Sequence, residues 1–159
     1  MINPEEDGIT HINIYSKART KLGKLLSNFA PTPFICEDGE FISVEGYWYW
    51  LLTDHPDKNK LRTEAGFWAK QTGRELGAKD WPDEKDEKFK EKIKKAITAK
   101  IYANKEIRKQ LAHCTLPFKH YYVYGDLKPK IVEVKGCEWM LDHMNEIRNK
   151  LVKNSEDGQ

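Results

Sequence analysis

The chain has 159 residues, of which 39% are hydrophobic and 11% aromatic, so it can bury the core of one domain, and wholesale disorder is excluded. Charged residues make up 33%, yet the formal net charge of +2 excludes one strong cationic field over the surface. Three scattered cysteines argue against a disulfide framework, and no apolar run suits a signal peptide or a membrane span, so we expect a cytoplasmic protein without membrane contact.

The first half of the chain combines short alternating segments with two helical segments. Apolar and polar residues alternate from Ile9 to Tyr15, as in a short strand. Asp38-Gly39 is typical of a hairpin turn, and Ser43 is typical of a helix N-cap. These patterns predict strands over 9–15, 34–36 and 40–43, a basic loop carrying Lys17, Arg19, Lys21 and Lys24, and helices over 45–52 and 62–71.

The second half is dominated by helices. Pro82, followed by acidic residues, predicts the start of the longest helix, in which Phe89, Ile93, Ile97 and Ile101 form one buried stripe. Asn104 predicts the cap of a shorter helix. Beyond it we expect strands over 118–124 and 130–134, a helix over 137–151 and a frayed tail over 154–159. The predicted fold is α+β, with a single domain over residues 1–153.

Glu45 is the first candidate for chemistry, because it heads an unusually aromatic run, Tyr47-Trp48-Tyr49-Trp50. A carboxylate beside stacking surfaces suits binding a sugar-linked base and breaking its glycosidic bond. The alternative is a first-turn glutamate that only stabilises the helix dipole, ahead of a helix buried on most sides. If the helix is not buried on most sides, at least one ring should line a cleft or a partner surface.

Other candidate sites have weaker signatures. The basic loop could receive a diphosphate but lacks the spacing of a P-loop, so a solvated loop is the alternative. The histidines and cysteines show none of the spacings that assemble metal ligands, so we expect no metal and no cofactor.

An ordered set of short motifs resembles the NADAR (YbiA-like) family. The set is Asn13-Ile14-Tyr15-Ser16, Leu26-Ser27-Asn28-Phe29, Ser43-Val44-Glu45-Gly46-Tyr47, Gly73-Arg74, Asp80-Trp81, Ala99-Lys100-Ile101 with Asn104, and Glu146-Ile147-Arg148. The resemblance spans nearly the whole chain. It implies an α+β domain that hydrolyses N-glycosidic bonds, either in riboflavin-pathway intermediates or between ADP-ribose and guanine in nucleic acid.

The resemblance also implies roles for individual residues. Glu45 matches the catalytic glutamate, and Asn28 and Trp81 match ligand-site positions. The other expected ligand-binding residues, from the same motifs, are Ser27, Tyr47 and Arg74. If an amine attacks the sugar and forms a Schiff base, Lys17 is our first candidate for that amine and Lys24 the second.

Two departures from the family pattern bear on the substrate. The riboflavin-type branch has Tyr-Trp-Gly-Asp-Gly where this chain has Val123-Tyr124-Gly125-Asp126-Leu127, and Glu138-Trp139-Met140 replaces a Leu-Gly. The basic loop is more similar to the ADP-ribosyl-guanine branch. We therefore expect the protein to remove ADP-ribose from guanine in nucleic acid, as a possible antitoxin to an ADP-ribosyltransferase encoded nearby. The alternatives are an N-glycosidase of riboflavin intermediates and a non-catalytic reader of ADP-ribose or NAD.

Overall fold

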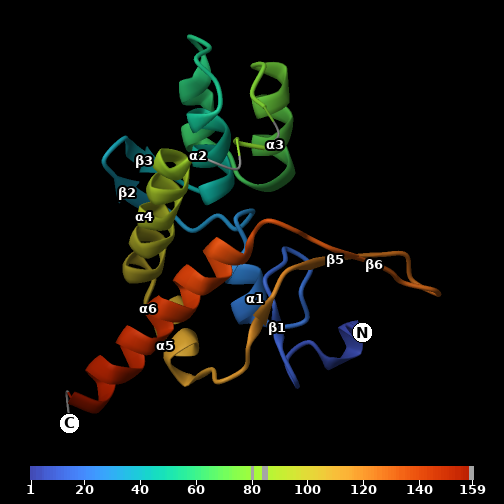
Figure 1. The fold of residues 1–159 in the computed structure, drawn as a ribbon. Helices are drawn as coiled ribbons and strands as arrows, with labels where there is room; N and C mark the ends of the chain where they lie inside the picture. The colour runs from blue at the N-terminus through green and yellow to red at the C-terminus, as the bar shows by residue number, and fades with distance from the viewer. Residues whose placement is uncertain (80, 84–85, 158–159) are drawn as a thin grey trace. The chain divides into compact units, whose positions relative to one another are not determined.

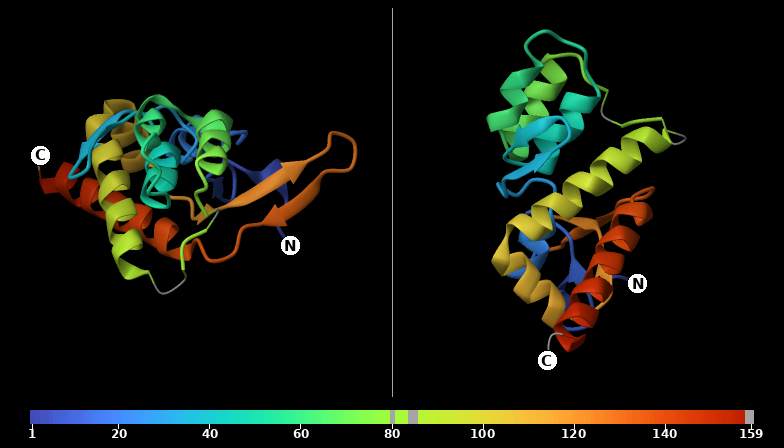
Figure 2. Two further views of the ribbon diagram at one scale, coloured as in Figure 1. Left: turned by 90° about the horizontal axis from the view of Figure 1, so that it is seen from above. Right: turned by 90° about the vertical axis from the view of Figure 1, so that its left-hand side faces the viewer.

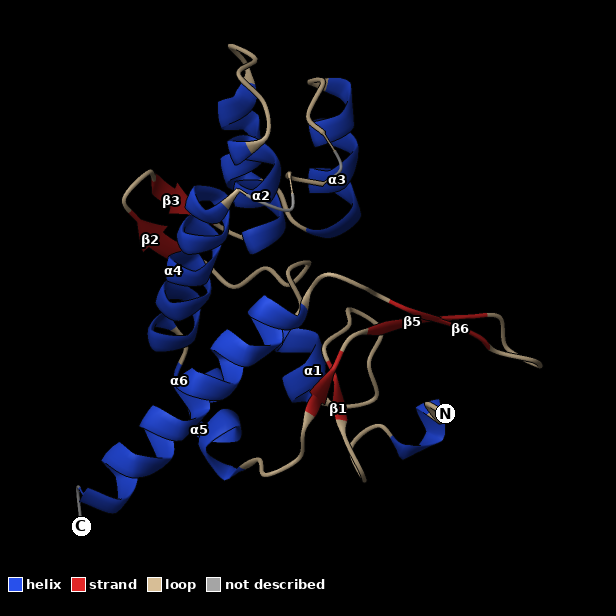
Figure 3. Ribbon diagram, in the orientation of Figure 1, coloured by secondary structure: helices blue, strands red, loops and turns tan. Residues whose placement is uncertain are grey.

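The structure, a computed structural model, describes residues 1–79, 81–83 and 86–157, with side chains as far as Asn154. The structure combines short strands with longer helices (Figure 3). The chain begins with a 3₁₀ turn, η1 (Pro4–Glu6), and the elements that follow are β1 (Ile12–Asn13), α1 (Lys21–Leu26), β2 (Phe34–Cys36), β3 (Gly39–Phe41), α2 (Val44–Leu51), η2 (Lys58–Thr63), α3 (Gly66–Glu75), α4 (Glu87–Ala103), α5 (Lys105–His113), β4 (Phe118–Lys119), β5 (Tyr121–Tyr124), β6 (Lys130–Glu133) and α6 (Glu138–Asp157). The α+β class is confirmed.

The chain forms two compact units. The first consists of Met1–Ser27 together with the chain from Glu106 onward, and the second is Asn28–Lys105. Within the described residues, strands pair two by two: β1 with β4 in parallel, and β2 with β3 and β5 with β6 antiparallel. No helix among those residues combines the length and the apolar character that crossing a membrane requires.

The first unit is built around the short parallel pair. β1 and β4 pair over two residues, Ile12 with Phe118 and Asn13 with Lys119, and the buried side chain of Asn13 extends the connection to the backbone of Tyr121. The β5–β6 hairpin runs out from the rest of this unit (Figures 1 and 2). The buried residues of α5 and α6 supply much of its core: Ile107, Leu111, Met140, Met144 and Ile147.

The second unit has an aromatic core. The rings of Phe34, Phe41 and Tyr47 contact one another where the β2–β3 hairpin meets α2. α4 lies against α2 and β2, and α2 and α3 lie side by side (Figure 1). All four residues of the predicted α4 stripe are buried: Phe89, Ile93, Ile97 and Ile101. The 3.6-residue period therefore identified the buried face of the longest helix correctly.

Several predicted boundaries are wrong. Part of the predicted basic loop is helix α1, because the Thr20 hydroxyl accepts a hydrogen bond from the N–H of Gly23 and caps the turn. The helix predicted over 62–71 is instead η2 followed by α3, with Glu64 extended between them. α4 begins at Glu87, not at Pro82, because Asp86 is its N-cap.

Strands are shorter and the last helix is longer than predicted. Only residues 12–13 of the predicted strand 9–15 are in β1, because β4 offers just two partners. The predicted strand 118–124 is split at His120 into β4 and β5. The expected tail begins inside α6, which continues to Asp157, and residues 158–159 lie outside the described chain.

Candidate functional site

Glu45 lies in the first turn of α2, and two hydrogen bonds of Ser43 define that turn. The Ser43 side-chain oxygen accepts a hydrogen bond from the N–H of Gly46 at 3.0 Å, as an N-cap residue does. The same hydroxyl donates to the carbonyl oxygen of Glu64 at 2.8 Å. The start of α2 is thereby tied to the segment that leads into α3.

Gly46 allows a close approach at the same place. A Cβ atom at this position would lie 2.4 Å from the carbonyl oxygen of Leu61 and 3.1 Å from that of Glu64. Only glycine leaves room for these backbone atoms. The position of Glu45 therefore depends on the absence of a side chain at the next residue.

Asn28 and Phe29 lie against the first turns of α2 and α3. The N–H of Glu45 donates to the carbonyl oxygen of Asn28 at 2.9 Å. An ideal Cβ on Gly66, the first residue of α3, would lie 3.7 Å from a ring carbon of Phe29, which is ordinary contact. Two motifs that are distant in sequence, Ser27-Asn28-Phe29 and Val44-Glu45-Gly46, thus meet through Asn28.

The environment of Glu45 favours its neutral form. Burial raises the pKa of Glu45 from 4.5 to about 7, and the charge of Lys70 on α3 partly opposes that rise. A carboxyl group with a pKa near 7 can donate or accept a proton at neutral pH. Burial separates Glu45 from a capping-turn glutamate in water, and its catalytic role stays a prediction.

Trp48 follows Glu45 by one helical turn and contacts Trp81. Trp48 is three residues after Glu45 and therefore lies on the same face of α2. Its buried ring meets Phe89 edge-on at 4.7 Å between centroids and Trp81 at 5.8 Å. Trp81 is 55% exposed, so it can offer ring surface to a ligand on this side of the unit.

Two other rings of the aromatic run, those of Tyr47 and Tyr49, are part of the core, whereas Trp50 is only partly buried. Tyr47 is fully buried and donates a 2.6 Å hydrogen bond to Asp38, and Tyr49 packs closely against Gly73. Tyr47 lies about 200° from Glu45 around the α2 axis, on a different face. The structure therefore shows a helix buried on most sides, which was the alternative explanation of this run. The assignment of Tyr47 to ligand binding stays a prediction.

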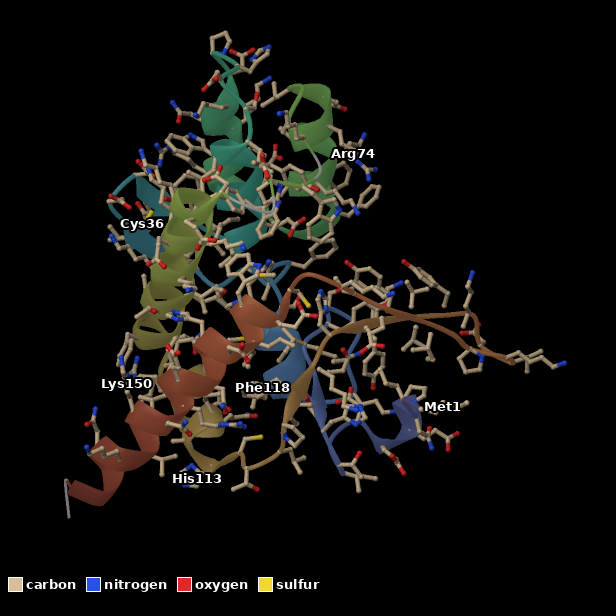
Figure 4. The ribbon with its side chains drawn as sticks, viewed as in Figure 1. Met1, Cys36, Arg74, His113, Phe118 and Lys150 are labelled. Carbon is tan, nitrogen blue, oxygen red and sulfur yellow. The ribbon has the colours of Figure 1, made fainter. Side chains whose placement is uncertain are left out.

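The remaining predicted site residues are divided between the two units. Arg74 is exposed and projects from the last turn of α3 in the second unit (Figure 4). Lys17 and Ser27 belong to the first unit. Lys17 is exposed in the turn before α1, and Ser27 is buried at the end of α1. The structure thus brings together Glu45 and Asn28, and it places Trp81 against Trp48, one helical turn after Glu45.

Lys100 is a buried lysine to which the sequence analysis assigned no role. Its side chain is 1% exposed, in the last turn of α4, and burial lowers its pKa from 10.5 to about 7. A signal was available, because Lys100 lies three residues after Ile97 and seven after Ile93 on the apolar stripe. A lysine that is partly neutral at pH 7 can act as a nucleophile or a base.

Nothing in the described part of the chain resembles a metal centre. No three His, Cys, Asp or Glu side chains gather there in a group that could hold an ion. The cation shown to act on Glu45 is Lys70.

Comparison with known proteins gives a structural match. No protein-family model matches the sequence, and no curated protein matches it. The NMR structure of the E. coli protein YbiA is similar over 97% of this chain and 95% of that chain, with a TM-score of 0.64 and 19% sequence identity. The fold is YbiA-like. The similarity covers residues of both units, and the single domain over residues 1–153 stays a prediction.

Proposed function

We propose that this protein is an N-glycosidase of the NADAR type that removes ADP-ribose from guanine bases in nucleic acid. The observation that carries the proposal is the pKa of Glu45, near 7, beside the aromatic pair of Trp48 and Trp81. The YbiA-like fold and the ordered motifs support the glycosidase class. The basic segment around α1 supports the choice of ADP-ribosyl-guanine within that class.

The ionised form of Glu45 can serve a hydrolytic displacement. As the bond between the ribose anomeric carbon and the guanine nitrogen breaks, its electron pair stays with the nitrogen and positive charge develops on the sugar. The Glu45 carboxylate stabilises that charge and takes a proton from the attacking water, whose oxygen bonds to the anomeric carbon. The guanine nitrogen gains a proton, so the products are free ADP-ribose and unmodified guanine.

Trp81 has a binding role in this mechanism. Its half-exposed ring would stack on the base or on the adenine of ADP-ribose, and stacking tolerates several bases. Arg74, Ser27 and Asn28 remain proposed ligand contacts.

A covalent route through an amine is the other chemical possibility. A neutral lysine would attack the anomeric carbon and form a Schiff base with the opened sugar. Lys17 is the candidate from the sequence and Lys24 the second; the burial of Lys100 makes it a third. Borohydride reduction during turnover traps such an adduct, and the variants Lys17→Ala, Lys24→Ala and Lys100→Met show which lysine carries it.

The direct test uses a single-stranded oligonucleotide with one ADP-ribosylated guanine. We expect the wild-type protein to release ADP-ribose and Glu45→Gln to lose at least about 100-fold in kcat/KM. Glu37→Gln, which alters an exposed glutamate of the same unit, is the matched control and should keep full activity.

Each alternative function predicts a different result. An oligonucleotide left intact by the wild-type protein rejects the proposal. Release of base from a pyrimidine ribosyl-phosphate would instead indicate an N-glycosidase of riboflavin intermediates. Binding of ADP-ribose with no cleavage of either substrate would indicate a reader. An ADP-ribosyltransferase encoded next to the protein would support the antitoxin role.

A further inference from the structure

Helix α3 exposes two large aromatic side chains in its first turn. Phe67 is 64% exposed and Trp68 is 72% exposed. They are neighbours in sequence, so on a helix they point about 100° apart. Each therefore has to be considered with the residues that share its own face.

Phe67 shares its face with two cations. Successive residues turn about 100° around a helix axis, so Lys70 lies about 60° from Phe67, and Arg74, seven residues after Phe67, lies about 20° from it. We call Phe67, Lys70 and Arg74 the α3 strip. Trp68 lies about 200° from Lys70, on the opposite flank of the helix.

The buried face of α3 separates these two flanks. Ala69 and Gly73 are the buried residues of the helix, and Gly73 faces the ring of Tyr49 on α2. Trp68 and Lys70 therefore flank the α2 contact on opposite sides.

The α3 strip is on the side of Glu45. Lys70 is close enough to Glu45 for its charge to lower the pKa of that carboxyl against the effect of burial. The hydrogen bond from Ser43 to the Glu64 carbonyl holds the first turn of α2 beside the residues that lead into α3. Phe67 follows this junction by three residues.

The charges around the strip suit a polyanion. Within α3 the charged residues are Lys70, Arg74 and Glu75; the Glu75 carboxylate lies about 20° from Trp68 and about 80° from Phe67 around the helix axis, so the face of Phe67 carries the two cations. One phenyl ring among cations is too small an apolar area for a stable protein interface, which buries about 800 Å² on each partner. It is enough to stack on one base, next to cations that pair with phosphates.

We propose that the α3 strip binds the nucleotides that flank the ADP-ribosylated guanine in a single strand, with Phe67 stacked on a neighbouring base and Lys70 and Arg74 paired with phosphates. This inference rests on the proposed function, because it assumes that the guanine enters the Glu45 site as part of a polynucleotide. It assigns a role to Phe67 and Lys70, and it makes a strand, not a free nucleotide, the preferred substrate.

The test compares two substrates for each variant. One is a single-stranded oligonucleotide with one ADP-ribosylated guanine, and the other is ADP-ribosylated guanosine, which has no flanking nucleotides. For Phe67→Ala we expect kcat/KM to fall roughly 5- to 100-fold on the oligonucleotide, as loss of one base stack predicts, and to stay within about twofold on the nucleoside. Trp68→Ala removes an equally exposed aromatic ring from the other flank and should change neither rate.

A salt titration tests the phosphate contact of Lys70. Binding of the unmodified oligonucleotide by wild-type protein should weaken with salt, and Lys70→Gln should reduce the slope of log K against log salt by about 0.7, the value for one phosphate of a single strand. Lys60→Gln, at an exposed lysine outside the strip, should leave the slope unchanged.

The outcomes separate this inference from the proposed function. Equal loss by Phe67→Ala on both substrates, or equal loss by Trp68→Ala and Phe67→Ala on the oligonucleotide, rejects the flanking-nucleotide site. Wild-type rates that are the same for nucleoside and oligonucleotide also reject it, while leaving the glycosidase intact. Cleavage of neither substrate by the wild-type protein rejects the proposed function itself.

Discussion

The backbone N–H of Glu45 donates a 2.9 Å hydrogen bond to the carbonyl oxygen of Asn28. Glu45 is the second residue of α2, where backbone N–H groups have no acceptor within the helix. The carbonyl of Asn28 supplies that acceptor. Asn28 therefore helps to define the start of α2, and with it the position of Glu45.

Ser43→Ala should destabilise the second unit more than an ordinary cap mutation does. The change removes the acceptor for the Gly46 N–H and the donor to the Glu64 carbonyl at a fully buried position, so we expect a loss of about 1–3 kcal/mol in the free energy of unfolding. Urea denaturation measures it. Thr20→Ala, which removes only the α1 cap, is the control, and an equal or smaller loss for Ser43→Ala would contradict the dual role.

Gly46→Ala should be destabilising although alanine favours helices. The added Cβ would lie 2.4 Å from the Leu61 carbonyl oxygen, so backbone must move, and we expect a loss of about 1–3 kcal/mol beyond the helix-propensity gain of about 1 kcal/mol. Glycosidase activity should fall with it, because Glu45 is the adjacent residue. Gln71→Ala, at an exposed position of α3, should change stability by less than about 0.5 kcal/mol.

Glu45 should make the protein less stable as pH rises from about 4.5 to 7. In this window the folded state keeps a proton that the unfolded state has lost, because burial raises the folded pKa to about 7. Glu45→Gln should remove this slope and be more stable than wild type at pH 8, by about 1–3 kcal/mol. Unfolding free energies at pH 5 and pH 8 measure both effects. A variant that is less stable than wild type at pH 8 would contradict the raised pKa.

Lys100 should have the opposite effect at higher pH. Between about pH 7 and 10.5 the unfolded state binds a proton that the folded state does not, because burial lowers the folded pKa to about 7, so stability should rise with pH in this window. Lys100→Met keeps the length of the side chain and should abolish that rise. Denaturation at pH 7 and pH 9.5 decides the matter. A wild-type stability that is flat between these values would show that Lys100 stays protonated.

The elements that the sequence predicted best are those whose signals are local. Ser43 caps α2, the Asp38-Gly39 turn connects β2 and β3, and the apolar stripe of α4 is buried as its period required. Each of these rests on residues within a few positions of one another. The prediction of a loop where the structure has α1 is wrong although its signal is also local. Thr20 is an N-cap residue, and the lysines that follow it were interpreted as a basic loop.

Properties that depend on distant residues were not predictable in this way. The hydrogen bond from Ser43 to the Glu64 carbonyl lies where η2 and α3 are separated. The length of β1 is limited to two residues because β4 has only two residues that pair with it. The burial of Lys100 likewise depends on what surrounds α4. No pattern within one segment contains this information.

The sequence by itself determined the α+β class, the buried stripe of α4, and Glu45 as the residue to test first. Periodicity, caps and each short motif depend on residues that are close together in the chain. Only the tertiary structure decided the chemical state of that residue. Burial and the opposing charge of Lys70 set the pKa of Glu45, and Lys70 belongs to α3, a helix that lies beside α2. The free energy of a charge depends on the atoms around it in space, whatever their place along the chain.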